Sequence, residues 1–207
     1  MGNLGLKGRT VIVELLIIVF VSYSLINLQF GFIKFADFTF NSNMLFFFSA
    51  WSNVLPAICA VFSLYYLHKE EKLPRLLAAM KLASVMMLTM SFLVIVLVIA
   101  PLKGWAMLFD FGGMIFLHLI VPILGALDFL FLADMYPLEK KDVIISLTPM
   151  MLYATMVLLT LIIAGNDDLA PYTFMRIHSQ PVYETILWMV GLFALGYALS
   201  YEFWRLV

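Results

Sequence analysis

The chain has very little of the charge that a soluble protein carries on its surface. Only 12% of its 207 residues are charged, whereas 64% are hydrophobic and the mean hydropathy is +1.04. A soluble globular domain is roughly one quarter charged and about half apolar, so the composition excludes an ordinary soluble fold. It predicts an integral membrane protein, with residues 1–207 forming a single membrane domain.

Residues that bind metals or form disulfides are equally scarce. The single cysteine, Cys59, excludes a disulfide within the chain, and three scattered histidines exclude an ordinary zinc cluster. There is no H-E-x-x-H, no G-x-S-x-G and no glycine-rich phosphate loop. The net charge of −1 gives no reason to expect a nucleic-acid partner. We therefore expect no metal and no cofactor.

What the chain has in abundance is long apolar runs. A helical span needs about 20 predominantly apolar residues, and the alternation of a membrane β-strand is absent. Six runs qualify: 10–29, 43–67, 76–101, 111–133, 143–164 and 183–204. Pro74 and Pro101 are expected to bracket the third run. Lys7 and Arg9 precede the first run, but no A-x-A site follows it, so we expect an uncleaved span. The predicted fold is all-α, with six transmembrane helices.

The basic residues predict the orientation of these spans, because cytoplasmic loops are enriched in Lys and Arg. One side of the predicted membrane holds nine: Lys7, Arg9, Lys69, Lys72, Arg75, Lys81, Lys140, Lys141 and Arg205. The other side holds three: Lys34, Lys103 and Arg176. The expected topology therefore places both termini in the cytoplasm.

His118 is the most unusual polar residue, because it lies inside an apolar run that is long enough to cross a bilayer. An ionisable residue at such a position is a hypothesis of a functional site. At 100° per residue it shares one face with a stripe of polar and small residues: Asp110, Met114, Val121, Gly125 and Asp128. We expect this stripe to face the bundle interior. The alternative role for His118 is a structural hydrogen bond between helices.

A second polar cluster, Thr39, Ser42 and Asn43, opens the second run. If the helical pattern extends back through this cluster, Thr39 lies near the outer membrane edge, a little above His118. The outer half of the first run adds Tyr23 and Asn27, which would bound the same pocket. The alternative reading of Thr39 is a local cap at the start of the second span.

These residue types support nucleophilic chemistry. A threonine hydroxyl is a poor nucleophile unless a base takes its proton, and a neutral imidazole can be that base. These types allow Thr39 to act as nucleophile and His118 as base, the roles that the family resemblance described next implies for them. The Asn43 amide is the candidate donor to the oxyanion, and Ser42 is the rival nucleophile.

Two segments resemble a known pattern. Phe35-Ala-Asp-Phe-Thr-Phe-Asn-Ser-Asn43 is similar to the F-x-Y-F-T-x-x-S-N segment of a bacterial family of small six-span membrane proteins. His118-Leu-Ile-Val-Pro122 resembles the H-x-x-x-P segment of that family, although Asp37 stands where an aromatic residue is usual. The family resembles the eukaryotic androgen-induced-gene proteins and the androgen-dependent regulator of tissue factor pathway inhibitor, which are multi-pass hydrolases of fatty acid esters of hydroxy fatty acids. The resemblance implies a Thr/His pair, a lipid ester substrate and a bacterial plasma membrane.

The prediction is therefore a membrane-embedded, Thr/His-dependent hydrolase of fatty acyl esters with its site in the outer half of the bundle. One rival is a lipid or small-molecule binder, or a proton-coupled transporter in which His118, Glu14 and Asp128 form a proton path. Another rival is a structural subunit, with the polar residues joining helices. The alternative role of Glu14 is to snorkel or to pair with a basic residue at the inner surface, and Asp128 is expected to pair with another group near that surface. Neither an oligomeric state nor a role for His178 has a signature in the sequence.

Overall fold

The computed structural model describes residues 2–30, 46–109 and 113–207, and these residues form helices and no strand. Five helical segments are long and apolar enough to cross a membrane: Lys7–Asn27, Phe48–His68, Arg75–Leu102, Lys140–Ala164 and Val182–Leu206. A shorter apolar helix covers Phe116–Leu132, where the fourth run was predicted. The all-helical membrane fold is confirmed, with five helices of spanning length.

The helices follow the apolar runs because, inside a bilayer, backbone N–H and C=O groups can form hydrogen bonds only with one another. The first three are α1 (Gly2–Phe30), α2 (Phe48–His68) and α3 (Arg75–Val94), which continues through the π-helical turn η2 (Ile95–Ile99) into α4 (Ala100–Lys103). The fourth run is η4 (Phe116–Ile120), α5 (Val121–Leu127) and η5 (Asp128–Leu132), of which η4 and η5 are π-helical. The last two runs are α6 (Lys140–Ile145) with α7 (Thr148–Ala164), and α8 (Val182–Leu206).

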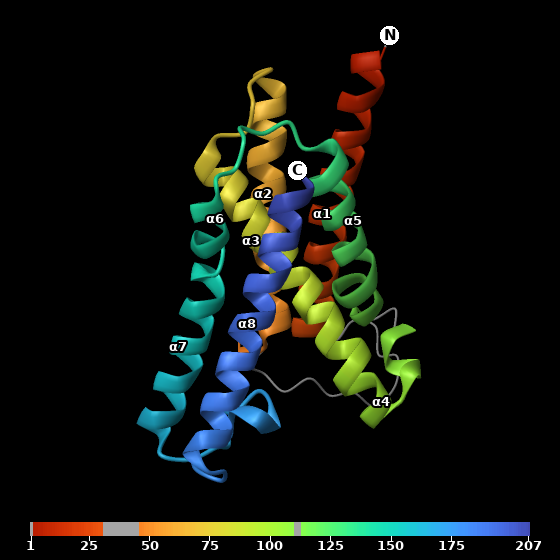
Figure 1. The fold of residues 1–207 in the computed structure, drawn as a ribbon. Helices are drawn as coiled ribbons and strands as arrows, with labels where there is room; N and C mark the ends of the chain where they lie inside the picture. Colours follow the sequence, from red (N-terminus) through yellow and green to blue (C-terminus); the bar gives the residue numbers. More distant parts are fainter. Residues whose placement is uncertain (1, 31–45, 110–112) are drawn as a thin grey trace.

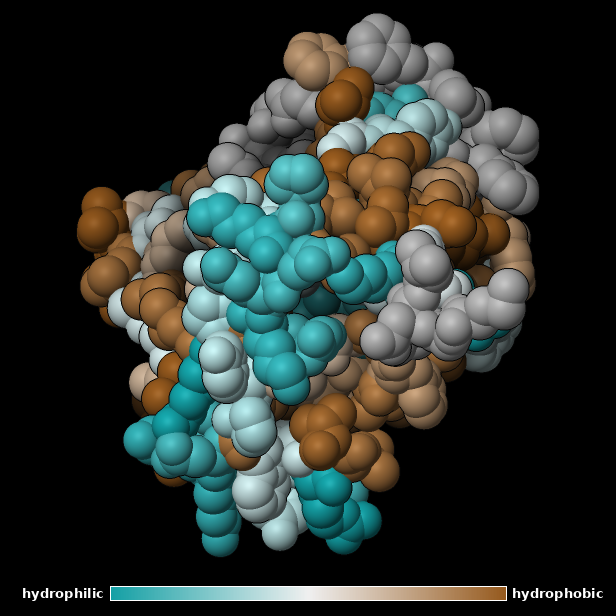
Figure 2. Space-filling view, turned by 90° about the horizontal axis from the view of Figure 1, so that it is seen from above, coloured by the Kyte–Doolittle hydropathy of each residue, from teal (hydrophilic) through white to brown (hydrophobic). Residues whose placement is uncertain are grey.

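The bundle has two distinct ends (Figure 1). Both termini, the connection from α2 to α3 and the connection to α6 lie toward one end, called the N/C end below. α4 and the connection from α7 to α8 lie toward the opposite end, called the far end. Seen from the N/C end, hydrophilic side chains gather through the middle of the molecule and hydrophobic ones lie to both sides (Figure 2).

Two prolines account for two of the π-helical turns. Pro101 follows η2 and Pro122 follows η4, each by two residues. A proline ring clashes with the carbonyl four residues earlier. In both turns the residue before the proline donates its N–H five residues back instead of four, which widens the turn. The third span was expected to stop at Pro101, and the helix ends two residues later, at Lys103, after the widened turn.

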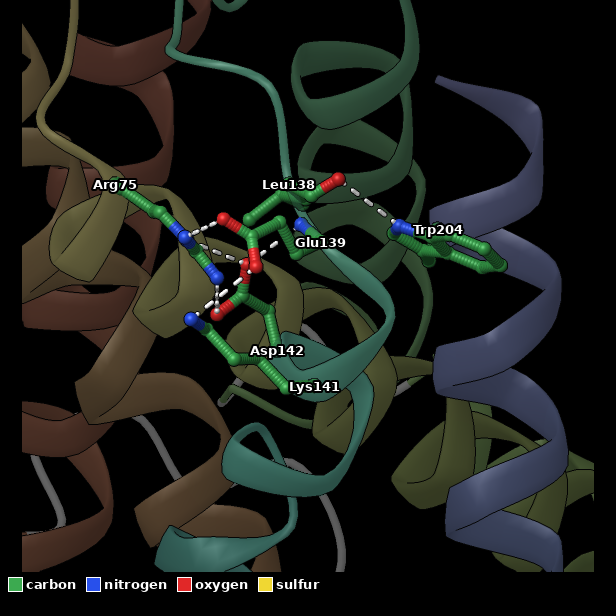
Figure 3. A network of polar contacts seen from close by, with 6 residues as sticks. All are labelled: Arg75, Leu138, Glu139, Lys141, Asp142 and Trp204. Atoms are coloured by element: carbon green, nitrogen blue, oxygen red, sulfur yellow. Dashed lines mark hydrogen bonds and ion pairs between the residues drawn. The ribbon is translucent and has the colours of Figure 1, made fainter.

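A polar network closes the N/C end (Figure 3). Arg75, the first residue of α3, donates from Nε to Asp142 Oδ2 at 2.9 Å and also pairs with Glu139 at the start of α6. The Trp204 indole on α8 donates to the carbonyl of Leu138 at 3.1 Å. These contacts join α3, α6 and α8 at one end.

Candidate functional site

His118 lies on η4 and is 3% exposed. Its Nδ1 is 3.3 Å from the hydroxyl oxygen of Ser91 on α3, which is also buried. Its Nε2 makes no hydrogen bond with any residue that the structure describes. The imidazole is therefore buried and bound through one nitrogen, with the other left for a different partner.

The predicted interior face of the fourth run is confirmed where the structure describes it. Met114, Val121, Gly125 and Asp128 are all buried, like His118. The sixth member of the stripe, Asp110, lies outside the described residues. The stripe survives the widened turn because η4 is only one turn long and the helix resumes as α5.

A proline also explains what holds the turn that carries His118. Because the N–H of Val121 bonds to residue 116, the next carbonyl, Leu117 O, would need the N–H of Pro122, which does not exist. The side-chain amide of Asn53 on α2 takes that place and donates to Leu117 O at 3.2 Å. Asn53 is fully buried, and the same amide also donates to Ser49 O at 2.8 Å. This bond fixes the backbone beside His118 to α2.

A cavity of about 460 Å³ lies beside the imidazole. His118 and Ser91 form part of its wall, and most of the remaining lining is aromatic or aliphatic, including Phe48, Phe174 and Phe193. The lining comes from the start of α2, the far-end half of α3, η4, α7, α8 and the connection before α8. Its volume is in the range of small-molecule binding sites, and its surface suits a hydrocarbon chain.

The other predicted site residues are placed differently. Thr39, Ser42 and Asn43 lie outside the described residues, and the described part of the second span begins at Phe48. Tyr23 meets the Phe116 ring edge-on from α1, with 5.5 Å between ring centroids. Asn27, also on α1, is buried. Neither Tyr23 nor Asn27 is among the described residues that line the cavity.

A second polar centre lies nearer the N/C end. The ammonium of Lys81 on α3 is 2.5 Å from Glu14 Oε1 on α1, forms an ion pair with Asp128 on η5, and donates to Ser63 Oγ on α2 at 2.9 Å. Lys81, Glu14 and Asp128 are 4%, 1% and 0% exposed. The expectation that Glu14 pairs with a basic residue is confirmed, and Asp128 pairs with the same residue, but this partner is inside the bundle and not at its surface.

The same spacing between polar residues recurs on four helical runs, and it separates the depths of the two centres. Four pairs of polar residues have members ten positions apart along one helical run: Glu14 and Ser24, Asn53 and Ser63, Lys81 and Ser91, His118 and Asp128. At 1.5 Å per residue this is about 15 Å along each helix. The gap is filled by a buried cluster, called the apolar layer below: Ile17, Val21, Ala60, Leu88 and Val121.

Sequence reasoning missed two of these residues. Ser91 is a single serine in an apolar run and drew no attention, and Lys81 was counted only as a basic residue of the cytoplasmic side. The signal that could have found both is the ten-residue spacing, because α3 and the fourth run are antiparallel neighbours that each carry two polar residues at this spacing.

Comparison of the chain with family models, with curated proteins and with solved structures finds no match. The functional argument therefore depends on the residues and their geometry.

Proposed function

We propose that the protein is a membrane-embedded hydrolase of fatty acyl esters, with Thr39 as nucleophile and His118 as base. The observation that carries this proposal is the buried His118 imidazole in the wall of an apolar cavity, with Nδ1 beside the Ser91 hydroxyl. An acyl chain suits the lining, and a neutral imidazole is the side chain that takes a proton from a hydroxyl near neutral pH. The two segments that resemble the bacterial six-span family support the same pair, and we propose membership of that family.

The reaction has two steps. Thr39 Oγ attacks the ester carbonyl while His118 takes its proton; the bond to the alcohol breaks, and the imidazole returns the proton to the leaving oxygen. The product is an acyl-threonine. Water then attacks the acyl carbon with His118 again as base, the fatty acid leaves, and Thr39 recovers its proton. Asn43 donates to the oxyanion in both steps, and Ser42 is the rival nucleophile.

Ser91 acts in this scheme as a positioning residue. When the Nδ1–H of His118 donates to Ser91 Oγ, the lone pair of the ring is on Nε2, which is the form needed in a base. Replacing Ser91 by alanine therefore lowers kcat and moves the acid limb of the pH–rate profile, while the covalent adduct stays on Thr39.

The proposed topology is six spans with both termini in the cytoplasm of a bacterial cell. The short apolar helix Phe116–Leu132 is the sixth crossing, and an even number of crossings agrees with two termini at one end (Figure 1). Lys81 is buried and does not count as a loop charge, so eight basic residues remain against three (9 − 1 = 8). A reporter fused after Val207 should read as cytoplasmic, and a reading from outside the membrane would overturn this orientation.

The test of the chemistry is turnover of a long-chain fluorogenic ester by purified protein in nanodiscs, together with labelling by a fluorophosphonate. Thr39→Ala and His118→Ala should each abolish turnover, and the double variant should be little worse, because the two residues act as one unit. The matched controls are Thr89→Ala, whose hydroxyl bonds only within α3 at Val85 O, and His68→Ala, whose imidazole is exposed at the end of α2.

The labelling and turnover results test whether Thr39 is the nucleophile. Label lost in Thr39→Ala and kept in Ser91→Ala supports Thr39. Full turnover in a folded Thr39→Ala protein removes Thr39 as nucleophile. Full turnover in His118→Ala as well ends the hydrolase proposal.

A further inference from the structure

The centre around Lys81 has a charge imbalance that the proposed chemistry does not involve. One ammonium lies against two carboxyl groups, and all three side chains are at least nine-tenths buried among the helices. If both carboxyls were ionised, the centre would carry a net charge of −1. An unbalanced charge in a hydrocarbon environment is one of the most costly features that a fold can contain.

The hydrogen bonds show the same deficit. The Lys81 ammonium donates hydrogen bonds to Glu14 Oε1 and Ser63 Oγ, and it forms an ion pair with Asp128. Glu14 Oε2 and both carboxyl oxygens of Asp128 are buried and find no hydrogen-bond partner among the described residues, and of these three atoms only Asp128 Oδ2 is in the ion pair with Lys81. The two carboxyl groups that share this ammonium therefore lack a donor.

Within the part of the chain that the structure describes, no other group packed against the centre supplies that donor or a balancing charge. On α2, Cys59 is a buried neutral thiol, and on α3 the Ser84 hydroxyl is directed to the carbonyl of Lys81 at 2.8 Å. Among the described residues, no second Lys, Arg or His forms an ion pair with Glu14 or Asp128. A metal cation would have only two free carboxylate oxygens and would meet the Lys81 ammonium at close range.

We propose that the cluster of Lys81, Glu14 and Asp128 is a proton-binding site. It binds one proton, taken from water, which forms an O–H bond on one carboxyl and donates to a free oxygen of the other. The centre then holds one ammonium, one carboxylate and one carboxylic acid, so it is neutral and its missing donor is supplied. This site is separate from the His118 chemistry, because the apolar layer lies between them.

Infrared spectroscopy of the wild-type protein in nanodiscs at neutral pH tests the proposal directly. We expect the C=O band of a protonated carboxylic acid, shifted when H₂O is replaced by D₂O. The band should disappear in Glu14→Gln and in Asp128→Asn, and persist in Glu71→Gln, which removes an exposed carboxylate at the N/C end. Absence of the band from the wild-type protein overturns the proposal, whatever the result of the ester assay.

Thermal melts of a charge series give an independent test. Glu14→Gln or Asp128→Asn alone leaves one carboxylate against one ammonium, so each variant should melt close to the wild type. The double variant leaves Lys81 unbalanced and should melt far lower, and addition of Lys81→Met should recover much of that loss. Single variants that melt as low as the double variant overturn the proposal.

Discussion

Two polar centres occupy the same four helices at different depths, and they differ in charge more than in burial. The centre near the N/C end has three ionisable groups, one ammonium and two carboxyls. The centre near the far end consists of neutral groups, with His118 and Ser91 joined by one hydrogen bond at 3.3 Å. The neutral centre is in the wall of the apolar cavity. The comparison sets a charged centre that joins three helices against a neutral centre where we propose the chemistry.

The largest expected effect comes from removing the ammonium. Lys81→Met leaves the carboxyls of Glu14 and Asp128 buried without a cation, and breaking a buried ion pair costs about 3–5 kcal/mol. His118→Ala removes one interhelical hydrogen bond, which averages about 0.6 kcal/mol in membranes. Thermal melts in detergent should therefore place Lys81→Met far below His118→Ala. Equal melting temperatures would contradict the division of roles between the centres.

A smaller effect is expected at the amide that holds η4. Asn53→Leu leaves the carbonyl of Leu117 without a donor, at a cost of about 1–3 kcal/mol, and it loosens the turn that carries His118. Both melting temperature and ester turnover should fall. Thr89→Ala is the matched control, because the Thr89 hydroxyl donates to Val85 O within α3 at 2.8 Å. If Asn53→Leu kept full turnover, the amide would not position the site.

The apolar layer between the centres can be tested at Gly125. A Cβ there would lie 2.7 Å from Leu88 Cδ1, so Gly125→Ala forces that side chain to move, at a cost of about 1 kcal/mol. Gly191→Ala on α8 meets nothing within 4 Å and should be neutral or stabilising. A chemical-denaturation series on both variants makes the comparison. A Gly125→Ala protein as stable as Gly191→Ala would mean that the layer adapts freely.

The smallest effect concerns acid and salt. Hydrogen bonds from Lys141 and Arg75 lower the pKa of Glu139 below its ordinary value of 4.5. Its contribution to stability is therefore present above that value and is lost as the pH falls through the lowered pKa. The melting temperature should decline slightly in acid, and Glu139→Gln should remove that part of the decline. Salt should weaken the exposed ion pairs of Glu139 and leave the buried Lys81 centre unchanged. If the difference in melting temperature between the wild type and Lys81→Met depended on salt, that contrast between the two sites would be contradicted.

The sequence predicted the helices well because apolar length is a direct requirement of the bilayer. It also predicted the inward face of His118, because one widened turn does not destroy the periodicity of the run. It did not identify Ser91, because a lone serine in an apolar helix acquires meaning only when its neighbour is known. Lys81 was misjudged for a similar reason: it lies six residues beyond Arg75, about 9 Å along α3, where its two partners come from distant parts of the chain. Thr39, with Ser42 and Asn43, stays a prediction.

The ion pair between Glu14 and Lys81 also has a consequence for biosynthesis. The two residues are 67 positions apart, so α1 reaches the membrane before its cation has been translated. A carboxylate released alone into lipid is unfavourable, so Glu14 has to remain protonated or stay beside the insertion machinery until α3 arrives. Asp128 comes later still and meets an ammonium that is already in place. Correct assembly therefore depends on the order in which the ribosome delivers the helices.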